Sequence, residues 1–220
     1  MTSSAEKLAT TATVKRVQKK RPEILPEIIT VTSGKGGVGK TNLAVNLGIM
    51  LTQRRQRVLL MDADLHLGKL DVVIGATPRY TLAELMDDSQ TLEEIIMHHP
   101  SGIDVLPATS GDLNLLEADT RMLKVLAESF ASIQARYDYL IVDTGAGVSS
   151  TVLTMALGAD KVILVVTPEP ASISDVYAMI KVIHSKSPNL PLILVPNRLR
   201  SLEDGLDLHK KLNLITQKFL

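Results

Sequence analysis

The chain has 220 residues, and 45% of them are hydrophobic, which is enough to bury one substantial core. Lysine and arginine together number 24, as do aspartate and glutamate, so no net charge attracts the protein to nucleic acid or to an anionic membrane. The absence of cysteine excludes disulfides, thiolate metal sites and iron–sulfur clusters. Since the sequence has neither a spanning apolar run nor a signal-peptide core, it predicts a cytosolic protein.

The first 26 residues predict a solvated, flexible arm. They are rich in serine, threonine, alanine and lysine, and two prolines close the segment. They also carry a basic cluster, Lys15, Arg16, Lys19, Lys20 and Arg21. Such charge runs usually remain in water, although a binding element is the alternative. We expect residues 27–220 to form a single domain.

Six short apolar runs predict the strands of a sheet. Several are apolar at every position rather than at alternate ones, which is typical of parallel strands buried on both faces. The runs are Ile28–Val31, Val58–Met61, Ile103–Pro107, Tyr139–Val142, Val162–Val166 and Leu192–Val195.

Helical patterns separate these runs, at Thr41–Thr52, Thr120–Arg136 and residues 206–220. Capping boxes predict three further helix starts, at Thr81 with Glu84, Thr91 with Glu94, and Ser172 with Asp175. Strands that alternate with helices predict a doubly wound α/β domain, with a mainly parallel sheet flanked by helices. Ligands of such sheets bind at the carboxyl ends of the strands.

The stretch "VTSGKGGVGKTN", residues 31–42, lies between a predicted strand and a predicted helix. Gly34, Gly39, Lys40 and Thr41 satisfy the pattern G-x-x-x-x-G-K-[ST] of a phosphate-binding loop. Glycines let backbone N–H groups approach phosphates, Lys40 would hold the β- and γ-phosphates, and the Thr41 hydroxyl would bind Mg²⁺. A glycine-rich surface turn is the alternative. We expect ATP contacts from Gly34, Lys35, Gly36, Gly37, Val38, Gly39, Lys40, Thr41 and Asn42.

"SGKGGVGKT" resembles the deviant phosphate-loop ATPases of the MinD/ParA class, and the resemblance extends from about Ile28 to the C-terminus. It implies a MinD-like P-loop fold and an ATPase that converts ATP and water to ADP and phosphate with Mg²⁺. It also implies that Lys35 reaches across an ATP-bound homodimer and acts in catalysis with Lys40.

Three further motifs carry the resemblance, "LLMDADLHLGKLDVVIG", "YLIVDTGAGVSS" and "ILVPNR". By position, Asp62 and Asp143 would serve the Mg²⁺ site, and Asp64 would orient or deprotonate the attacking water. Asn197 would recognise adenine, with Arg198 beside it. The alternatives are a helix cap for Asp64, a strand-ending turn for Asp143 and an ordinary turn residue for Asn197.

"TPRYTLAELMDD", "GIDVLPATSG" and "TPEPASISDVYAMIKVI" are similar to the FlhG (FleN) branch, whose members regulate flagellar number and placement. This resemblance implies an FlhF-like GTPase, switch-complex or regulator proteins as partners, and a cytoplasmic location, peripheral to the inner face of the membrane in some members. Of the FlhF-activating D-Q-A-x-x-L-R element, "SSAEKLA" keeps only Ala5 and Leu8. The chain also ends before the branch's membrane-targeting helix, so membrane contact is not carried over.

Two other functions remain open at this stage. A ParA- or MinD-type ATPase for DNA segregation or division-site placement shares the motifs, but DNA binding would need a basic surface that the neutral charge does not provide. An ATP-dependent metabolic ligase would need a further substrate pocket. The five histidines, which include the adjacent His98 and His99, are scattered and predict neither a metal site nor a triad.

Overall fold

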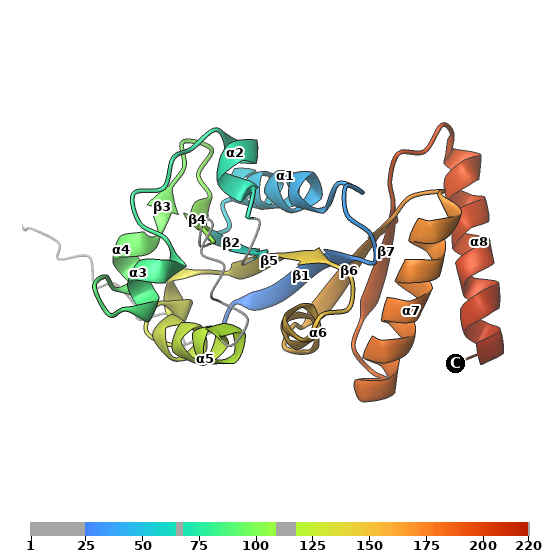
Figure 1. Cartoon of the computed structure of the whole chain (residues 1–220). Coiled ribbons are helices and arrows are strands. Elements are labelled where there is room, and N and C mark those ends of the chain that lie inside the picture. The colour runs from blue at the N-terminus through green and yellow to red at the C-terminus, as the bar shows by residue number, and fades with distance from the viewer. Residues whose placement is uncertain (1–24, 65–67, 109–117, 220) are drawn as a thin grey trace, which may run out of the picture.

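A seven-stranded sheet forms the centre of the protein in the computed structural model, which describes residues 25–64, 68–108 and 118–219 (Figure 1). The strand order is β3-β4-β2-β5-β1-β6-β7, and every neighbouring pair is parallel except β3 with β4. The strands are β1 (Glu27–Ser33), β2 (Val58–Ala63), β3 (Met97–His98), β4 (Asp104–Leu106), β5 (Tyr139–Ala146), β6 (Lys161–Val166) and β7 (Leu192–Pro196). The predicted doubly wound, mainly parallel sheet is confirmed, and β3 is an addition that the sequence did not predict.

Helices cover both faces of the sheet, with α1 and α2 above it and α5 and α6 below it in Figure 1. α7 and α8 pack together at the end of the sheet formed by β6 and β7 (Figure 1). The helices are α1 (Lys40–Gln53), α2 (Leu70–Ile74), α3 (Leu82–Met86), α4 (Leu92–Ile95), α5 (Ala118–Phe130), α6 (Ser150–Leu157), α7 (Pro170–Lys186) and α8 (Leu202–Phe219).

The apolar composition of the strands follows from this layering. In β6, Ile163 and Val165 join the apolar cluster beneath α1, whereas Val162 and Leu164 join the cluster of α6, α7 and α8 on the opposite face. Successive side chains of a strand point to opposite faces, so a strand covered on both faces is apolar at every position. The interpretation of "VILVV" as a two-sided buried strand is therefore confirmed.

The helix starts are only partly as predicted. Both capping boxes at Thr81 and Thr91 are present. The predicted box at Ser172 is wrong, because α7 begins at Pro170 with Glu169 as its N-cap. The Ser172 hydroxyl lies inside the helix and accepts a hydrogen bond from the Thr167 backbone N–H at 3.0 Å.

One predicted helix ends earlier than expected, and most of the predicted N-terminal arm lies outside the described residues. The predicted helix over residues 120–136 stops at Phe130, and a separate 3₁₀ turn covers Gln134–Arg136. Of the predicted N-terminal arm, only Leu25 and Pro26 lie within the described residues, so the basic cluster lies outside them.

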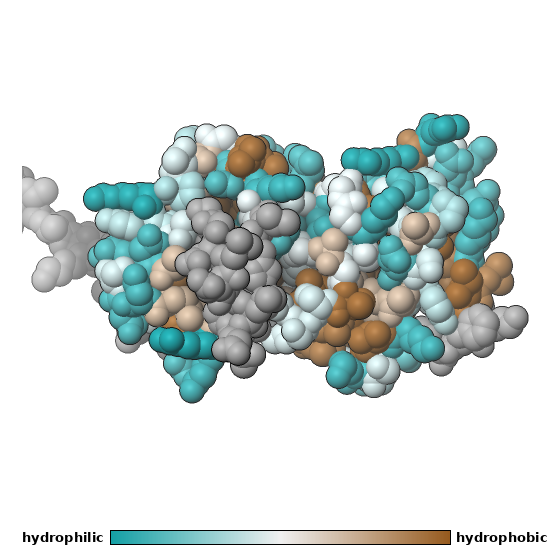
Figure 2. Space-filling view, in the orientation of Figure 1, coloured by the Kyte–Doolittle hydropathy of each residue, from teal (hydrophilic) through white to brown (hydrophobic). Residues whose placement is uncertain are grey.

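β7 is an edge strand of the described sheet. Ile193 in this strand is 43% exposed. Pro191 directly precedes the strand, and Pro196 is its last residue. Figure 2 shows a mostly hydrophilic face with a hydrophobic area over α6. None of the helices within the described ranges is long and apolar enough to cross a bilayer.

Candidate nucleotide-binding site

A cavity of about 920 Å³ opens at the carboxyl ends of β2 and β5, beside the loop that follows β1. Eight of the predicted site residues line it, Gly36, Gly37, Gly39, Lys40, Thr41, Asn42, Asp64 and Arg198. The other lining residues are Ala63, Lys69, Val73, Gly145, Ala146, Ser149, Ser150, Thr151 and Val152. Lys69 and the start of α6 line the cavity although neither belongs to the phosphate-loop pattern, so the sequence did not predict them as site residues.

The loop owes its shape to glycine. Gly37 and Gly39 have φ values of 74° and 102°, a left-handed conformation that other residues rarely adopt. A Cβ on Gly34 would lie 2.3 Å from the Asp175 Cβ atom, so this glycine allows the loop to pass directly against α7. α1 then begins at Lys40 and presents its positive end to the cavity. The arrangement suits an anion such as a phosphate group.

Lys40 brings a buried positive charge to this cavity. The residue is 8% exposed, and burial lowers the pKa of its ammonium group, while the nearby carboxylates of Asp143 and Asp64 act to raise it. A bound anion would add to this favourable interaction with the ammonium group. The charge is therefore placed as the predicted role in phosphate binding requires.

Two predicted metal ligands, Asp62 and Asp143, are direct neighbours in the register of β2 and β5. Both are 2% exposed. The pKa of Asp143 is raised to about 7, chiefly by burial and also by the neighbouring Asp62, while a hydrogen bond from the Thr41 side chain acts to lower it. Burial likewise raises the pKa of Asp62 to about 6. The strand pairing thus brings together carboxylates that lie 81 positions apart in sequence.

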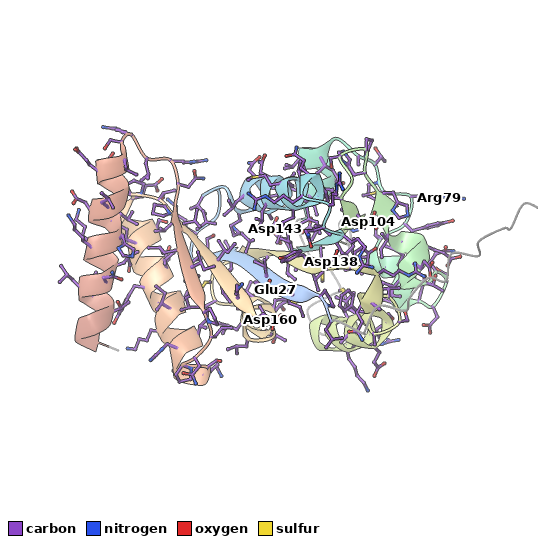
Figure 3. The ribbon with its side chains drawn as sticks, turned by 180° about the vertical axis from the view of Figure 1, so that it is seen from behind. Glu27, Arg79, Asp104, Asp138, Asp143 and Asp160 are labelled. Atoms are coloured by element: carbon purple, nitrogen blue, oxygen red, sulfur yellow. The ribbon has the colours of Figure 1, made fainter. Side chains whose placement is uncertain are left out.

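The Oδ1 atom of Asp143 is buried and has no hydrogen-bond partner among the described residues. By contrast, carboxylates at the opposite, amino ends of the strands are satisfied by the protein (Figure 3). Glu27 pairs with Lys161, and Asp160 accepts a hydrogen bond from a backbone N–H at 2.8 Å. Burying a carboxylate oxygen without a partner costs free energy, so Asp143 is placed to bind something that the chain itself does not supply.

Asp62 has a structural task that the sequence did not reveal. Its two oxygens accept hydrogen bonds from the backbone N–H groups of Asp64 and Leu70, at 3.0 and 3.1 Å. A Cβ on Gly68 would lie 2.8 Å from its Oδ2 atom. Asp62 therefore ties Asp64 and the start of α2 to the end of β2, and its role toward Mg²⁺ stays a prediction.

Asp64 lines the cavity and lies against the turn after Asp143. A Cβ on Gly145 would lie 3.4 Å from its Oδ1 atom, so the carboxylate faces the backbone of that turn. The alternative reading of Asp64 as a helix cap finds no support, since the N-cap residue of α2 is Lys69.

The remaining predicted residues lie around the rim or behind the loop. Lys35 forms an ion pair with Glu169, its side chain is 41% exposed, and it does not line the cavity. Val38 is buried beneath the loop. Asn197 donates from its side-chain amide to the Val38 carbonyl oxygen, at 2.8 Å. Arg198 has a φ of 56° and lines the cavity.

The adjacent histidines make local contacts away from this cavity. His98 contacts Asp104, and His99 contacts Ser101 at 2.7 Å. Within the described ranges, no group of three or more histidine and acidic side chains is arranged to hold a metal ion.

Comparison with known proteins places this chain in a family. Residues 26–191 match the AAA domain family. The antiactivator FleN of Pseudomonas aeruginosa is 38% identical over 88% of this chain and 69% of its own length. The flagellum site-determining protein YlxH of Helicobacter pylori is 33% identical over 84% of this chain and 63% of its own length. The chain thus spans about two thirds of the curated relatives it matches.

Solved structures of related proteins have the same fold as this chain. A chain of the MinC:MinD cell division complex of Aquifex aeolicus superposes with a TM-score of 0.67 at 31% identity, covering 84% of this chain and 78% of its own. MinD of Pyrococcus horikoshii complexed with Mg-ADP has a TM-score of 0.68 at 26% identity, covering 84% of this chain and 77% of its own. Together with the phosphate loop and the paired carboxylates, these matches show that the chain belongs to the AAA domain family and, within it, to the MinD/ParA class of P-loop ATPases.

Proposed function

We propose that this chain is a Mg²⁺-dependent ATPase that dimerises when it binds ATP and returns to monomers after hydrolysis. The observation that carries the proposal is the buried Oδ1 atom of Asp143, which has no partner in the described part of the chain and lies in the same cluster as the Lys40 ammonium group and the Thr41 hydroxyl. These three groups have the chemistry needed to hold a metal-bound triphosphate at a helix N-terminus.

The donor set fits Mg²⁺, which prefers carboxylate and hydroxyl oxygens and retains several of its waters. Asp143 and Thr41 would hold the ion. When bound, Mg²⁺ would neutralise charge that develops on the phosphates. The presence of Mg-ADP in the Pyrococcus horikoshii relative supports this assignment.

Within this proposal, Asp64 orients the attacking water or takes its proton, because its carboxylate lines the cavity and faces the Gly145 turn. Lys35 acts on the nucleotide of a second copy. Its half-exposed side chain at the rim supports that role, since a group that must cross an interface has to be accessible in the monomer.

The names of two relatives, an antiactivator and a flagellum site-determining protein, support a role in flagellar number or placement. The output of the ATPase would then be a regulated contact with protein partners, such as an FlhF-like GTPase, switch-complex or regulator protein.

Calorimetry and size-exclusion chromatography test the proposal. The parent protein should bind Mg-ATP, whereas Lys40→Ala should lose binding because the buried ammonium is gone. Asp64→Ala should bind Mg-ATP, lose at least about a hundredfold in turnover, and accumulate as a dimer. Glu128→Ala, which removes an exposed carboxylate on α5, is the control and should behave as the parent. A folded parent that gives no heat with Mg-ATP, or an Asp64→Ala protein that stays monomeric with ATP, would contradict the proposal.

Lys35→Ala tests the contact across the dimer. A cationic group supplied to phosphoryl transfer in this way is worth on the order of 10³ to 10⁵ in rate. The variant should therefore bind Mg-ATP but lose most of its turnover. Turnover and dimerisation equal to those of the parent would show that Lys35 has no such role.

A further inference from the structure

The side chain of Asn197, at the end of β7, reaches the phosphate loop. We propose that Asn197 is a positioning residue for phosphate binding: it holds the Val38 carbonyl and thereby aims the Gly39 N–H group into the cavity. This inference rests on the proposed nucleotide site, but it gives Asn197 a task that does not involve the adenine base.

The amide of Asn197 is firmly placed. Its backbone N–H donates to the Val166 carbonyl at 2.8 Å, which continues the pairing of β7 with β6. Its side-chain Nδ2 atom donates to the Val38 carbonyl at 2.8 Å. Val38 itself is 2% exposed and belongs to the apolar cluster beneath α1. The hydrogen bond therefore joins two anchored segments that lie 159 positions apart in sequence.

The direction of this bond determines the direction of the next N–H group. The Val38 carbonyl and the Gly39 N–H belong to one planar peptide group, and all the described peptide bonds are trans. In a trans peptide the C=O and N–H bonds point to opposite sides. With the carbonyl held on the Asn197 side, the Gly39 N–H points away from Asn197.

Gly39 needs such a restraint more than other residues do. Its φ of 102° is open to glycine, which has no Cβ to limit rotation of the peptide groups on either side. A Cβ at this position would lie 2.5 Å from the Asn197 Nδ2 atom, so the side-chain amide and the loop backbone approach as closely as glycine allows. The peptide group that follows Gly39 is held by α1, because the Gly39 carbonyl accepts a hydrogen bond from the Leu43 N–H at 3.0 Å, and Asn197 holds the peptide group that precedes it.

A fixed N–H donor binds phosphate more tightly than a freely rotating one, because no ordering is required when the anion arrives. A hydrogen bond to a charged group corresponds to about ten- to a hundredfold in affinity. Loss of the Asn197 amide should therefore weaken ligands that have no base at all. Base recognition predicts the opposite, since it requires a base in the ligand.

Calorimetry with Mg-tripolyphosphate and Mg-ATP separates the two roles. Asn197→Asp keeps the shape of the side chain but replaces the N–H donor with an oxygen, and Asn197→Ala removes the group. Both variants should bind Mg-tripolyphosphate about ten- to a hundredfold more weakly than the parent, and Mg-ATP should weaken by at least as much. Asn213→Ala, which removes an exposed amide on α8, is the matched control and should bind both ligands as the parent does.

If either Asn197 variant bound Mg-tripolyphosphate with an affinity within about twofold of the parent, the proposed positioning role would be wrong, whether or not its affinity for Mg-ATP fell. Circular dichroism and thermal unfolding establish that each variant is folded. If only one of the pair folds, that one decides. A parent that binds neither ligand would refute the proposed function instead, so the two failures are distinguishable.

Discussion

Asp143→Asn should stabilise the metal-free protein, although it removes a proposed metal ligand. The parent buries a carboxyl group whose pKa is raised from 3.8 to about 7, chiefly by burial. Asparagine has nearly the same shape and carries no charge. Its amide can accept from Thr41 and donate toward Asp62, so the buried polar atoms are better satisfied.

The size of the effect depends on pH, and its sign is opposite to that of a paired carboxylate. The folded protein retains the Asp143 proton up to about pH 7, whereas the unfolded chain releases it near 3.8. Stability is therefore lost as the pH rises through this window. At about 1.4 kcal/mol for each pKa unit, the loss is about 2 kcal/mol at pH 5 and about 4 kcal/mol at pH 8. The variant avoids this loss, so its advantage should grow with pH.

Urea denaturation at pH 5 and pH 8, without Mg²⁺ and nucleotide, measures both differences. Asp88→Asn is the control. Asp88 is an exposed residue with a φ of 59°, which asparagine also tolerates, so this variant should show no comparable trend. With saturating Mg-ATP, the parent should gain stability by ligand binding, and Asp143→Asn should gain much less. An Asp143→Asn protein that is less stable than the parent at pH 8, or equally advantaged at both pH values, would refute the reasoning.

Two further predictions concern the loop and its rim. Gly34→Ala should lower the melting temperature and abolish Mg-ATP binding, because the new Cβ would lie 2.3 Å from the Asp175 Cβ. Gly36→Ala is the control, since a Cβ there has open space and the variant should fold normally. Equal melting temperatures for the two variants would contradict this prediction. Glu169→Gln should leave stability within about 1 kcal/mol of the parent, since the Lys35 pair is exposed, but should increase the fraction of ATP-dependent dimer in ultracentrifugation by freeing Lys35. An unchanged dimer fraction would show that the ion pair does not compete with dimerisation.

The sheet could be predicted because its signal is local. A strand covered on both faces must be apolar throughout, and five of the six predicted runs lie within a strand, while the sixth, Ile103–Pro107, extends one residue beyond each end of β4. β3 has only two residues and α2 only five, too short to show a period. The box at Ser172 failed for a different reason, because the serine hydroxyl is used by the Thr167 N–H rather than by a helix end.

The site was predictable where one motif contains the whole arrangement, as in the loop from Gly34 to Thr41. The carboxylates could be anticipated because parallel strands end at the same edge. Contacts between distant segments could not. Lys35 and Glu169 lie 134 positions apart, and the bond between Asn197 and Val38 joins the two ends of the domain. No local pattern specifies either contact.

The outer margin of β7 has a practical consequence for handling the protein at high concentration. An edge strand has unpaired backbone N–H and C=O groups that can pair with another extended chain, and the half-exposed Ile193 adds apolar surface at this edge. The backbone groups of Pro191 and Asn197 pair with β6, so the alternate residues between them face the free edge, and there Pro196 has no N–H to donate to an added strand. The proline at the end of β7 thus removes one of the donors that a further strand would need in order to extend the sheet.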